Sequence, residues 1–280
     1  MHLNFAFNAV QILWTLTFAA HLVLLVVLLG RDRASRFPWF TIAIALVALR
    51  LVSSRLLYGR LPAITMNAIF IALADLSAVA GLMVVVEVAR RSFGRAQRRT
   101  WMVWSAALVV LSGGVLAGWG PWPAWKSMTP DTPLAVLGLM QLLAQKTGLL
   151  VDVLTVALGL LVLLFGRRYG AGWRSHAQQL VIGLSTASLG QIAVQVIWQI
   201  IARTAAPHSQ AEYMRIVGLR EKLFNANSAL YVAVLIWWIV CLWMDEPGAA
   251  LRAEQLPVGE GAVPQEATAP TAKHSGGSQV

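Results

Sequence analysis

Residues 145–168 read QKTGLLVDVLTVALGLLVLLFGRR, an apolar stretch that ends at two arginines. From Gly148 to Gly166 this stretch is long enough, at about 1.5 Å per residue, to cross the hydrocarbon core of a bilayer as one helix. Its interior contains one acidic residue, Asp152. The stretch therefore predicts a membrane span, and the carboxylate raises the question of what it faces.

The rest of the chain has the same apolar character. Of its 280 residues, 58% are hydrophobic and 12% are charged, whereas soluble domains carry about 25% charged residues. Apolar runs long enough for a span recur at 5–29, 37–57, 62–89, 101–119, 134–166, 177–203 and 223–244. These runs predict an all-α polytopic membrane protein, with a bundle of seven transmembrane helices over residues 1–246. The fifth run is longer than one simple span, so we expect its first turns to tilt or to lie outside the membrane.

The two ends of the chain differ from the bundle. The N-terminal MHLNFAFNAV lacks the basic region and cleavage site of a signal peptide, and we expect a retained first helix. Residues 247–280 are rich in Pro, Gly, Ala and Glu and have no periodic apolar face. This composition predicts a disordered cytoplasmic tail.

Basic residues are distributed unevenly among the linkers. Eleven of the 22 Lys and Arg residues follow the first, third and fifth runs, and six lie in the intervening linkers. Because short basic loops stay in the cytoplasm, this pattern predicts an N-terminus outside and a C-terminus inside. We attribute the net charge of +10 to topology and anionic lipid headgroups. The expected partner is the lipid bilayer, and no nucleic acid is needed to explain the charge.

The chain lacks residues that several functions of seven-helix proteins require. Residues 223–244 contain no lysine for a retinal Schiff base, and His21 is the only histidine inside a predicted span. We interpret His21 as a packed, hydrogen-bonded residue rather than a haem ligand. A single cysteine, Cys241, and the lack of a His/Asp set argue against a zinc centre. The sequence thus indicates no catalytic residue, no metal site and no cofactor.

Three segments carry a family resemblance. They are RFPWFT at 36–41, GWRSHAQQLVIGLSTAS at 172–188 and NANSALYVAVLIWWIVCLW at 225–243. With them the chain resembles, over most of residues 1–246, an uncharacterised family of bacterial seven-helix membrane proteins that is abundant in acidobacterial genomes. The resemblance implies the same bundle and a bacterial inner (cytoplasmic) membrane location, and it transfers no site residue.

Polar residues of several helices fall at one depth. Counted from the expected cytoplasmic helix ends, Arg50, Asp75 and Asp152 all lie about 20 Å into the membrane. Gln191 and Tyr231 fall at about the same depth on the last two helices. Ionisable residues in spans cost about 2.5–3.5 kcal/mol each and usually face the bundle interior. We therefore expect Arg50 to pair with one aspartate, and the other to hold a proton or a cation.

Helical spacing extends this layer. Ser188, Gln191 and Gln195 share one face, and Asn227 and Tyr231 are four residues apart. The sequence therefore predicts a polar cavity that opens outward between the last three helices. The candidate ligand-binding residues are Arg50, Asp75, Asp152, Gln191, Gln195, Asn227 and Tyr231. The alternative is that these side chains only form interhelical hydrogen bonds, worth about 0.6 kcal/mol each in membranes.

Two further features have structural interpretations. Gly183, Ala187 and Gly190 are small enough to let the sixth helix approach a neighbour closely. Glu87 and Arg55 lie near helix ends, where long charged side chains can snorkel toward water.

Three functions remain open at this stage. The favoured interpretation is a small-ligand-binding or sensory membrane protein, with a small molecule or lipid as its ligand. The first alternative is a small transporter or proton-coupled permease, although the sequence has no internal repeat or broken helix pair. The second is a structural subunit that needs a membrane-protein partner.

Overall fold

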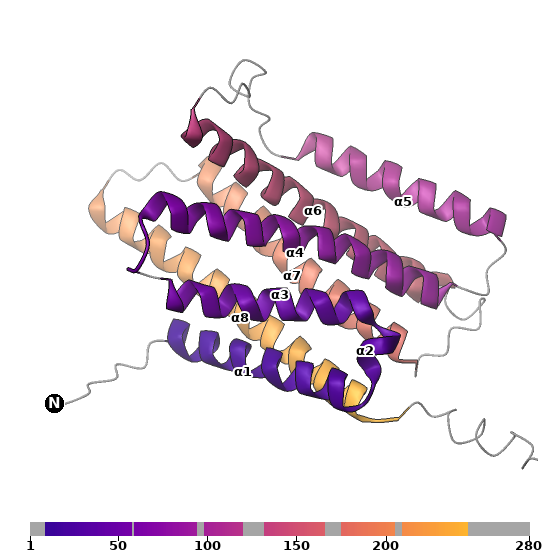
Figure 1. The fold of residues 1–280 in the computed structure, drawn as a ribbon. Coiled ribbons are helices and arrows are strands. Elements are labelled where there is room, and N and C mark those ends of the chain that lie inside the picture. The colour runs from indigo at the N-terminus through magenta and orange to yellow at the C-terminus, as the bar shows by residue number, and fades with distance from the viewer. Residues whose placement is uncertain are drawn as a thin grey trace, which may run out of the picture. The chain divides into compact units, whose positions relative to one another are not determined.

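The computed structural model of the chain describes residues 9–57, 59–93, 98–119, 132–165, 175–204 and 209–245. All regular structure in these ranges is helical (Figure 1). The helices are α1 (Ala9–Gly30), α2 (Arg33–Arg36), α3 (Pro38–Leu56), α4 (Ala63–Ser92), α5 (Arg98–Gly118), α6 (Pro133–Phe165), α7 (His176–Thr204) and α8 (Gln210–Trp243). The predicted tail at 247–280 lies outside the described residues.

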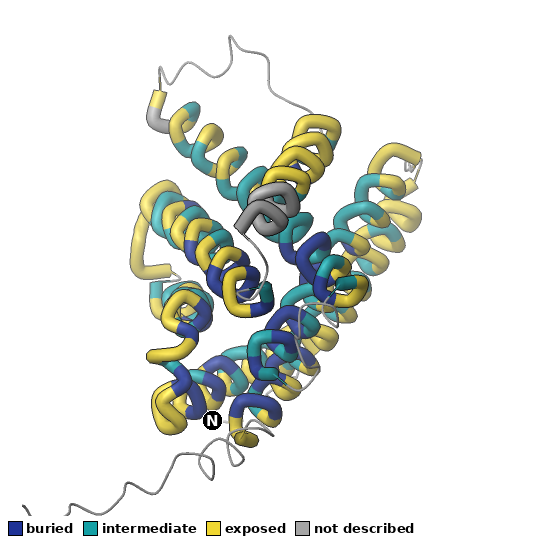
Figure 2. The backbone as a smooth tube through the Cα atoms, turned by 90° about the vertical axis from the view of Figure 1, so that its right-hand side faces the viewer, coloured by how far each residue is buried: buried dark blue, intermediate teal, exposed yellow. Residues whose placement is uncertain are grey.

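Six of the described helices are long and apolar enough to cross a bilayer, namely α1, α3, α4, α6, α7 and α8. The sequence predicts seven spans. The fourth predicted run is helical as α5 (Arg98–Gly118), which is not among these six candidate spans. Many large apolar side chains of the bundle are exposed, as expected where lipid is the solvent. Figure 2 shows exposed positions, in yellow, along the helices. The chain is thus a multi-pass helical membrane protein.

The last helix begins earlier than the sequence predicts. Hydropathy places its start at residue 223, whereas α8 starts at Gln210. The Ser209 side chain accepts a hydrogen bond of 3.2 Å from the backbone N–H of Glu212, in the S-x-x-E pattern of a helix N-terminus. This cap starts a polar extension that hydropathy does not detect. With 34 residues, α8 is about 51 Å long and extends well beyond one bilayer core.

Six helices form a closed ring. Going round it, α1 packs on α3, α3 on α4, α4 on α6, α6 on α7, α7 on α8, and α8 again on α1. In contrast, α5 packs against α6 on the outside of this ring (Figure 1). Segments from both ends of the described chain therefore face the same interior.

One end of the ring is filled by an apolar core. Its most deeply buried members come from the last turns of α1, α4, α6 and α8 and the first turns of α3 and α7, and include Leu28, Phe40, Val88, Leu158, Leu180 and Leu235. Trp238 belongs to the same core and meets Phe40 edge to face, with ring centroids 5.1 Å apart. We call this the closed end of the ring.

Glycines on α7 allow close approach of α8. A Cβ at Gly183 would lie 2.2 Å from Nε1 of Trp238, and one at Gly190 would lie 2.6 Å from Cδ2 of Leu230. Both distances are too short for a side chain. The prediction that small residues on this helix permit tight packing is confirmed at Gly183 and Gly190.

Glu87 has a different role from the one predicted. Its side chain does not snorkel to water but is buried, and it accepts a hydrogen bond of 3.1 Å from the backbone N–H of Phe40. The first N–H groups of a helix have no partner inside that helix, and α3 has no cap from its own residue Phe37. The carboxylate of α4 therefore caps α3, and Arg91, 3.9 Å away, adds a counter-charge.

The end of α8 is tied to the neighbouring helices. Arg33 donates to Asp245 at 2.9 Å, and Arg31 lies 3.7 Å from the other oxygen of the same carboxylate. His176 lies 3.0 Å, through Nε2, from the carbonyl of Met244. The last described residues are thus connected to the turn after α1, to α2 and to α7.

Candidate functional site

The half of the ring beyond the core is hollow. A cavity of about 560 Å³ lies between all six ring helices, rather than between only the last three as predicted. Phe40, Val84 and Trp238 line its floor, and Val10, in the first turn of α1, lies at the other extreme. The polar lining consists of Thr17, Arg50, Ser77, Asp152, Thr155, Ser188, Gln191, Asn225, Asn227, Ser228 and Tyr231. The site therefore has an apolar base and polar upper walls.

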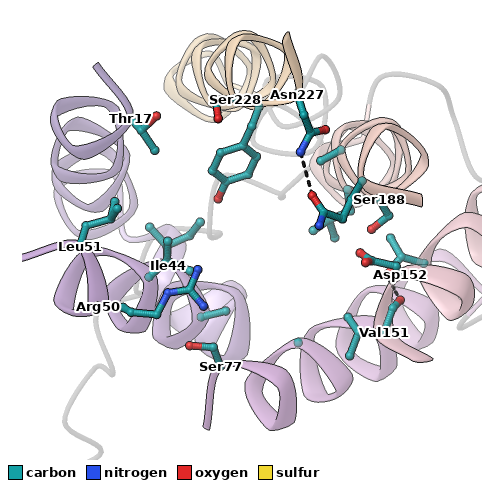
Figure 3. Close-up of a pocket in the computed structure, with 18 of the residues that line it drawn as sticks. Thr17, Ile44, Arg50, Leu51, Ser77, Val151, Asp152, Ser188, Asn227 and Ser228 are labelled. Atoms are coloured by element: carbon teal, nitrogen blue, oxygen red, sulfur yellow. Dashed lines mark hydrogen bonds between the residues drawn. The ribbon is translucent and has the colours of Figure 1, made fainter. Parts of the chain in front are cut away.

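Arg50 and Asp152 both face this cavity but do not meet. Figure 3 shows them on opposite sides, Arg50 from α3 and Asp152 from α6. Among the described residues, Arg50 forms no ion pair within 4.0 Å of Asp152 or of Asp75, so the predicted direct pair is wrong. The Ser188 hydroxyl on α7 lies beside the Asp152 carboxyl and interacts with it (Figure 3). The two charged side chains therefore line opposite walls of the cavity.

Asp75 does not contribute to the cavity. On α4 the lining residues are Ser77, Gly81, Val84 and Val85, which share one face. Asp75 precedes Ser77 by two residues and so points about 200° away around the helix. Its Oδ1 is buried, and no described residue forms a hydrogen bond with it. Depth can be counted from sequence, but the direction in which a helix turns each residue depends on its neighbours.

Gln191 and Asn227 link α7 to α8. The Asn227 amide donates to Oε1 of Gln191 at 2.7 Å (Figure 3). Gln195, one turn further along α7, is partly buried but is not among the lining residues. The predicted polar face of α7 therefore enters the cavity only through Ser188 and Gln191.

Tyr231 is joined to His21. The His21 ring is fully buried; its Nδ1 lies 2.6 Å from the Thr17 carbonyl, and its Nε2 lies 3.0 Å from the Tyr231 hydroxyl. A carbonyl can only accept, so Nδ1 donates, and in the neutral ring Nε2 accepts the Tyr231 proton. The interpretation of His21 as a packed, hydrogen-bonded residue is confirmed. The charge of Arg50 acts on both His21 and Tyr231, which places the guanidinium on their side of the cavity.

Most hydroxyl groups of the lining use their proton within their own helix. The acceptors are carbonyl oxygens four residues earlier, and the donors are Thr17 (2.7 Å), Ser77 (2.7 Å), Thr155 (2.6 Å) and Ser228 (2.9 Å). Toward the cavity these oxygens present lone pairs. The lining is consequently rich in acceptors, and Arg50 is its charged donor.

Sequence reasoning missed several lining residues. Thr17, Ser77, Asn225 and Ser228 all line the cavity. Asn225 and Ser228 are three apart on α8, which is a helical spacing that could have found them. Thr17 and Ser77 are single hydroxyls in apolar runs and give no such signal.

Comparison with known proteins finds no matching family, no similar curated protein and no similar solved structure. In the part of the chain that the structure describes, no group of three His, Cys, Asp or Glu side chains could hold a metal ion. The chemistry of the site must therefore be judged from the geometry of the cavity.

Proposed function

We propose that this protein is a small-ligand-binding or sensory membrane protein, and that its ligand occupies the cavity inside the six-helix ring. The observation that carries the proposal is the cavity of about 560 Å³ with Arg50 and Asp152 on opposite walls. Ligand sites usually have volumes of about 300–1,000 Å³, with apolar walls and a few placed polar groups.

The size and the charges favour a ligand site over simple helix packing. The Asn227–Gln191 and Tyr231–His21 hydrogen bonds join neighbouring helices and so contribute to packing. Arg50 and Asp152 instead line an open space, where each costs about 2.5–3.5 kcal/mol on insertion scales. Charges kept at that cost usually mark a functional site in membrane proteins.

The closed end favours binding over transport. Phe40 and Trp238 belong to a continuous buried core that fills the ring below the cavity. A permeating solute would have to open that core. The same end holds Met244 and Asp245 through Arg33 and His176, so a ligand that shifts the ring helices would also move these last described residues. This coupling fits a sensory role.

We also propose that α5 is a seventh span and that the closed end faces the cytoplasm of a bacterial cell. Both α4 and α6 end at the closed end, so the chain between them must return along the bundle, and α5 lies beside α6 (Figure 1). Its 21 residues cover about 32 Å. The more basic linkers follow α1, α4 and α6 at the closed end, which supports an inner-membrane protein with its N-terminus outside.

A thermal-shift screen of the purified full chain against small metabolites and lipids tests the binding proposal. Ligands that occupy the cavity should raise the melting temperature of the wild type, by mass action on the folded state. Two variants should block the space, Ala187→Phe on α7 and Ser77→Phe on α4, because both residues line the cavity.

The matched control is Thr186→Phe, which adds the same ring to an exposed position of the same helix. It should keep every ligand shift that the blocking variants lose. Ligand shifts that survive in both folded blocking variants would place binding outside the cavity and contradict the proposal.

A further inference from the structure

The cavity holds one positive and one negative side chain, on separate walls. Arg50 comes from α3 and Asp152 from α6, and Figure 3 shows them facing the space from opposite sides. No ion pair within 4.0 Å joins them in the described part of the chain. Two opposite charges that line one cavity without touching leave room for a molecule that contacts both.

The surroundings of Asp152 are suited to a group with N–H donors. Thr155, one turn along the same face of α6, gives its proton to the Val151 carbonyl at 2.6 Å. Ser188 interacts with the carboxyl itself. The oxygens near Asp152 thus present lone pairs, and an ammonium carries donors and no acceptor.

The surroundings of Arg50 have the opposite requirement. The Tyr231 proton is used by His21, and the protons of Thr17 and Ser77 are used by their own helices. On this side the guanidinium therefore supplies the N–H donors for an anion. Carboxylate and phosphate groups match its planar fork.

Apolar side chains line part of the space between these two walls. Ile44, Val151 and Leu184 line it together with the aromatic floor, and Ile44 lies beside Arg50 (Figure 3). Methylene groups of a ligand would lose water here at little polar cost.

We propose that the cavity binds a small zwitterion, with its carboxylate or phosphate on Arg50 and its primary ammonium on Asp152. This inference rests on the proposed function and specifies the class of ligand. The shared chemistry occurs in free amino-acid-like molecules and in the ethanolamine headgroup of a phospholipid. A trimethylammonium group would fit less well, because it offers no N–H donor to Asp152 and Thr155.

The test measures the melting temperature of the detergent-purified full chain with charge-matched probes. The zwitterions are γ-aminobutyrate and ε-aminocaproate. Hexylamine and hexanoate each carry one of the two charges, and N-trimethylated ε-aminocaproate lacks the N–H donors. We expect at least one zwitterion to bind at least about tenfold more tightly than the single-charge probes and the trimethylated probe.

Variants assign the two ends of the probe. Arg50→Gln should weaken binding of the zwitterion but leave the weaker binding of hexylamine unchanged. Asp152→Asn should also weaken binding of the zwitterion but leave the weaker binding of hexanoate unchanged. Asp75→Asn is the matched control, because Asp75 has the same predicted depth but does not line the cavity. Arg60→Gln is the control for arginine, since Arg60 is exposed and does not line the cavity. Both controls should bind the zwitterion like the wild type.

A second arm separates the two sources of the headgroup. The chain is placed in nanodiscs of phosphatidylcholine, with or without phosphatidylethanolamine. A lipid ligand would raise the melting temperature only with phosphatidylethanolamine, and only when Arg50 and Asp152 are intact. A rise of the melting temperature with the soluble zwitterions, but not with phosphatidylethanolamine, assigns the site to a free metabolite.

Some outcomes would overturn the zwitterion assignment and leave the proposed function intact. In the first, a neutral or singly charged compound from the wider screen binds in the cavity, and neither zwitterion nor the ethanolamine lipid changes the melting temperature. In the second, the wild type binds the zwitterions and the single-charge probes equally tightly. This comparison uses only the wild type and does not depend on the folding of any variant. If no probe and no library compound shifts the wild type, both proposals fail together.

Discussion

Tyr231 and His21 show how a single contact positions a residue of the cavity. Tyr231 lines the cavity and also donates to a histidine that water does not reach. The sequence identifies both residues but not their contact, because they lie on the first and last ring helices. Only the closure of the ring brings α1 and α8 together.

Replacing Tyr231 with Phe should lower the free energy of unfolding by about 0.6 kcal/mol and by at most about 1.7 kcal/mol, the mean and the maximum measured for interhelical hydrogen bonds in a membrane bundle. The ring is kept, and the loss comes from leaving Nε2 of His21 without its donor. Chemical denaturation of the detergent-solubilised protein measures the change. Tyr213→Phe, at an exposed position of the same helix, should have no effect. Equal stability of both variants would show that the His21 contact contributes nothing.

Glu87 also acts through a single long-range contact, in this case with the first turn of a neighbouring helix. Glu87→Ala should cost about 1–3 kcal/mol, because it leaves the buried N–H of Phe40 without an acceptor. Glu87→Gln retains an acceptor oxygen and should cost less. The measurement is thermal unfolding, with Glu221→Ala at an exposed site as control. If Glu87→Ala melts like this control, the carboxylate does not cap α3.

At the scale of helices, close packing on α7 sets the width of the ring. Gly183→Ala should destabilise the protein by about 1–3 kcal/mol, the usual cost of overpacking. The cause is the 2.2 Å that would separate the new Cβ from the Trp238 indole. Gly218→Ala on α8 is a matched control, since no atom lies within 4 Å of its added Cβ. This control should be neutral, or more stable by about 0.5–1 kcal/mol, because alanine favours the helix.

Chemical denaturation of the two glycine variants under identical conditions shows whether steric crowding or the helix propensity of alanine determines the change in stability. A gain of stability in both would mean that α7 and α8 are not in close contact at Gly183. The core of the closed end would then be looser than the structure indicates.

For the whole molecule, the orientation in the membrane is the prediction on which the direction of ligand entry depends. In a Cys241→Ser background, a cysteine at exposed Ser35 should resist an impermeant maleimide in intact spheroplasts. A cysteine at exposed Thr204, at the opposite end of the ring, should react. Permeabilised cells provide the control, in which both should be labelled. The reverse pattern in intact cells would place the closed end outside.

Much of the architecture could be predicted from sequence alone. Apolar runs at 37–57, 62–89, 134–166 and 177–203 match α3, α4, α6 and α7 to within a few residues. Helices in lipid must satisfy their own backbone, so an apolar run of sufficient length has few alternatives. The same local reasoning selected Arg50, Asp152, Gln191, Asn227 and Tyr231, which all line the cavity.

Only the tertiary structure decided which of these residues share a space. Asp75 and Asp152 are equally deep by residue count, yet only Asp152 faces the cavity. Depth is a one-dimensional quantity that the rise per residue determines, whereas the facing direction depends on how a helix packs against its neighbours. The start of α8 and the capping of α3 by Glu87 likewise depend on contacts, local or distant, that hydropathy does not register. The sequence thus determined the class of protein and the layer of its polar groups, and the ring of helices determined the site.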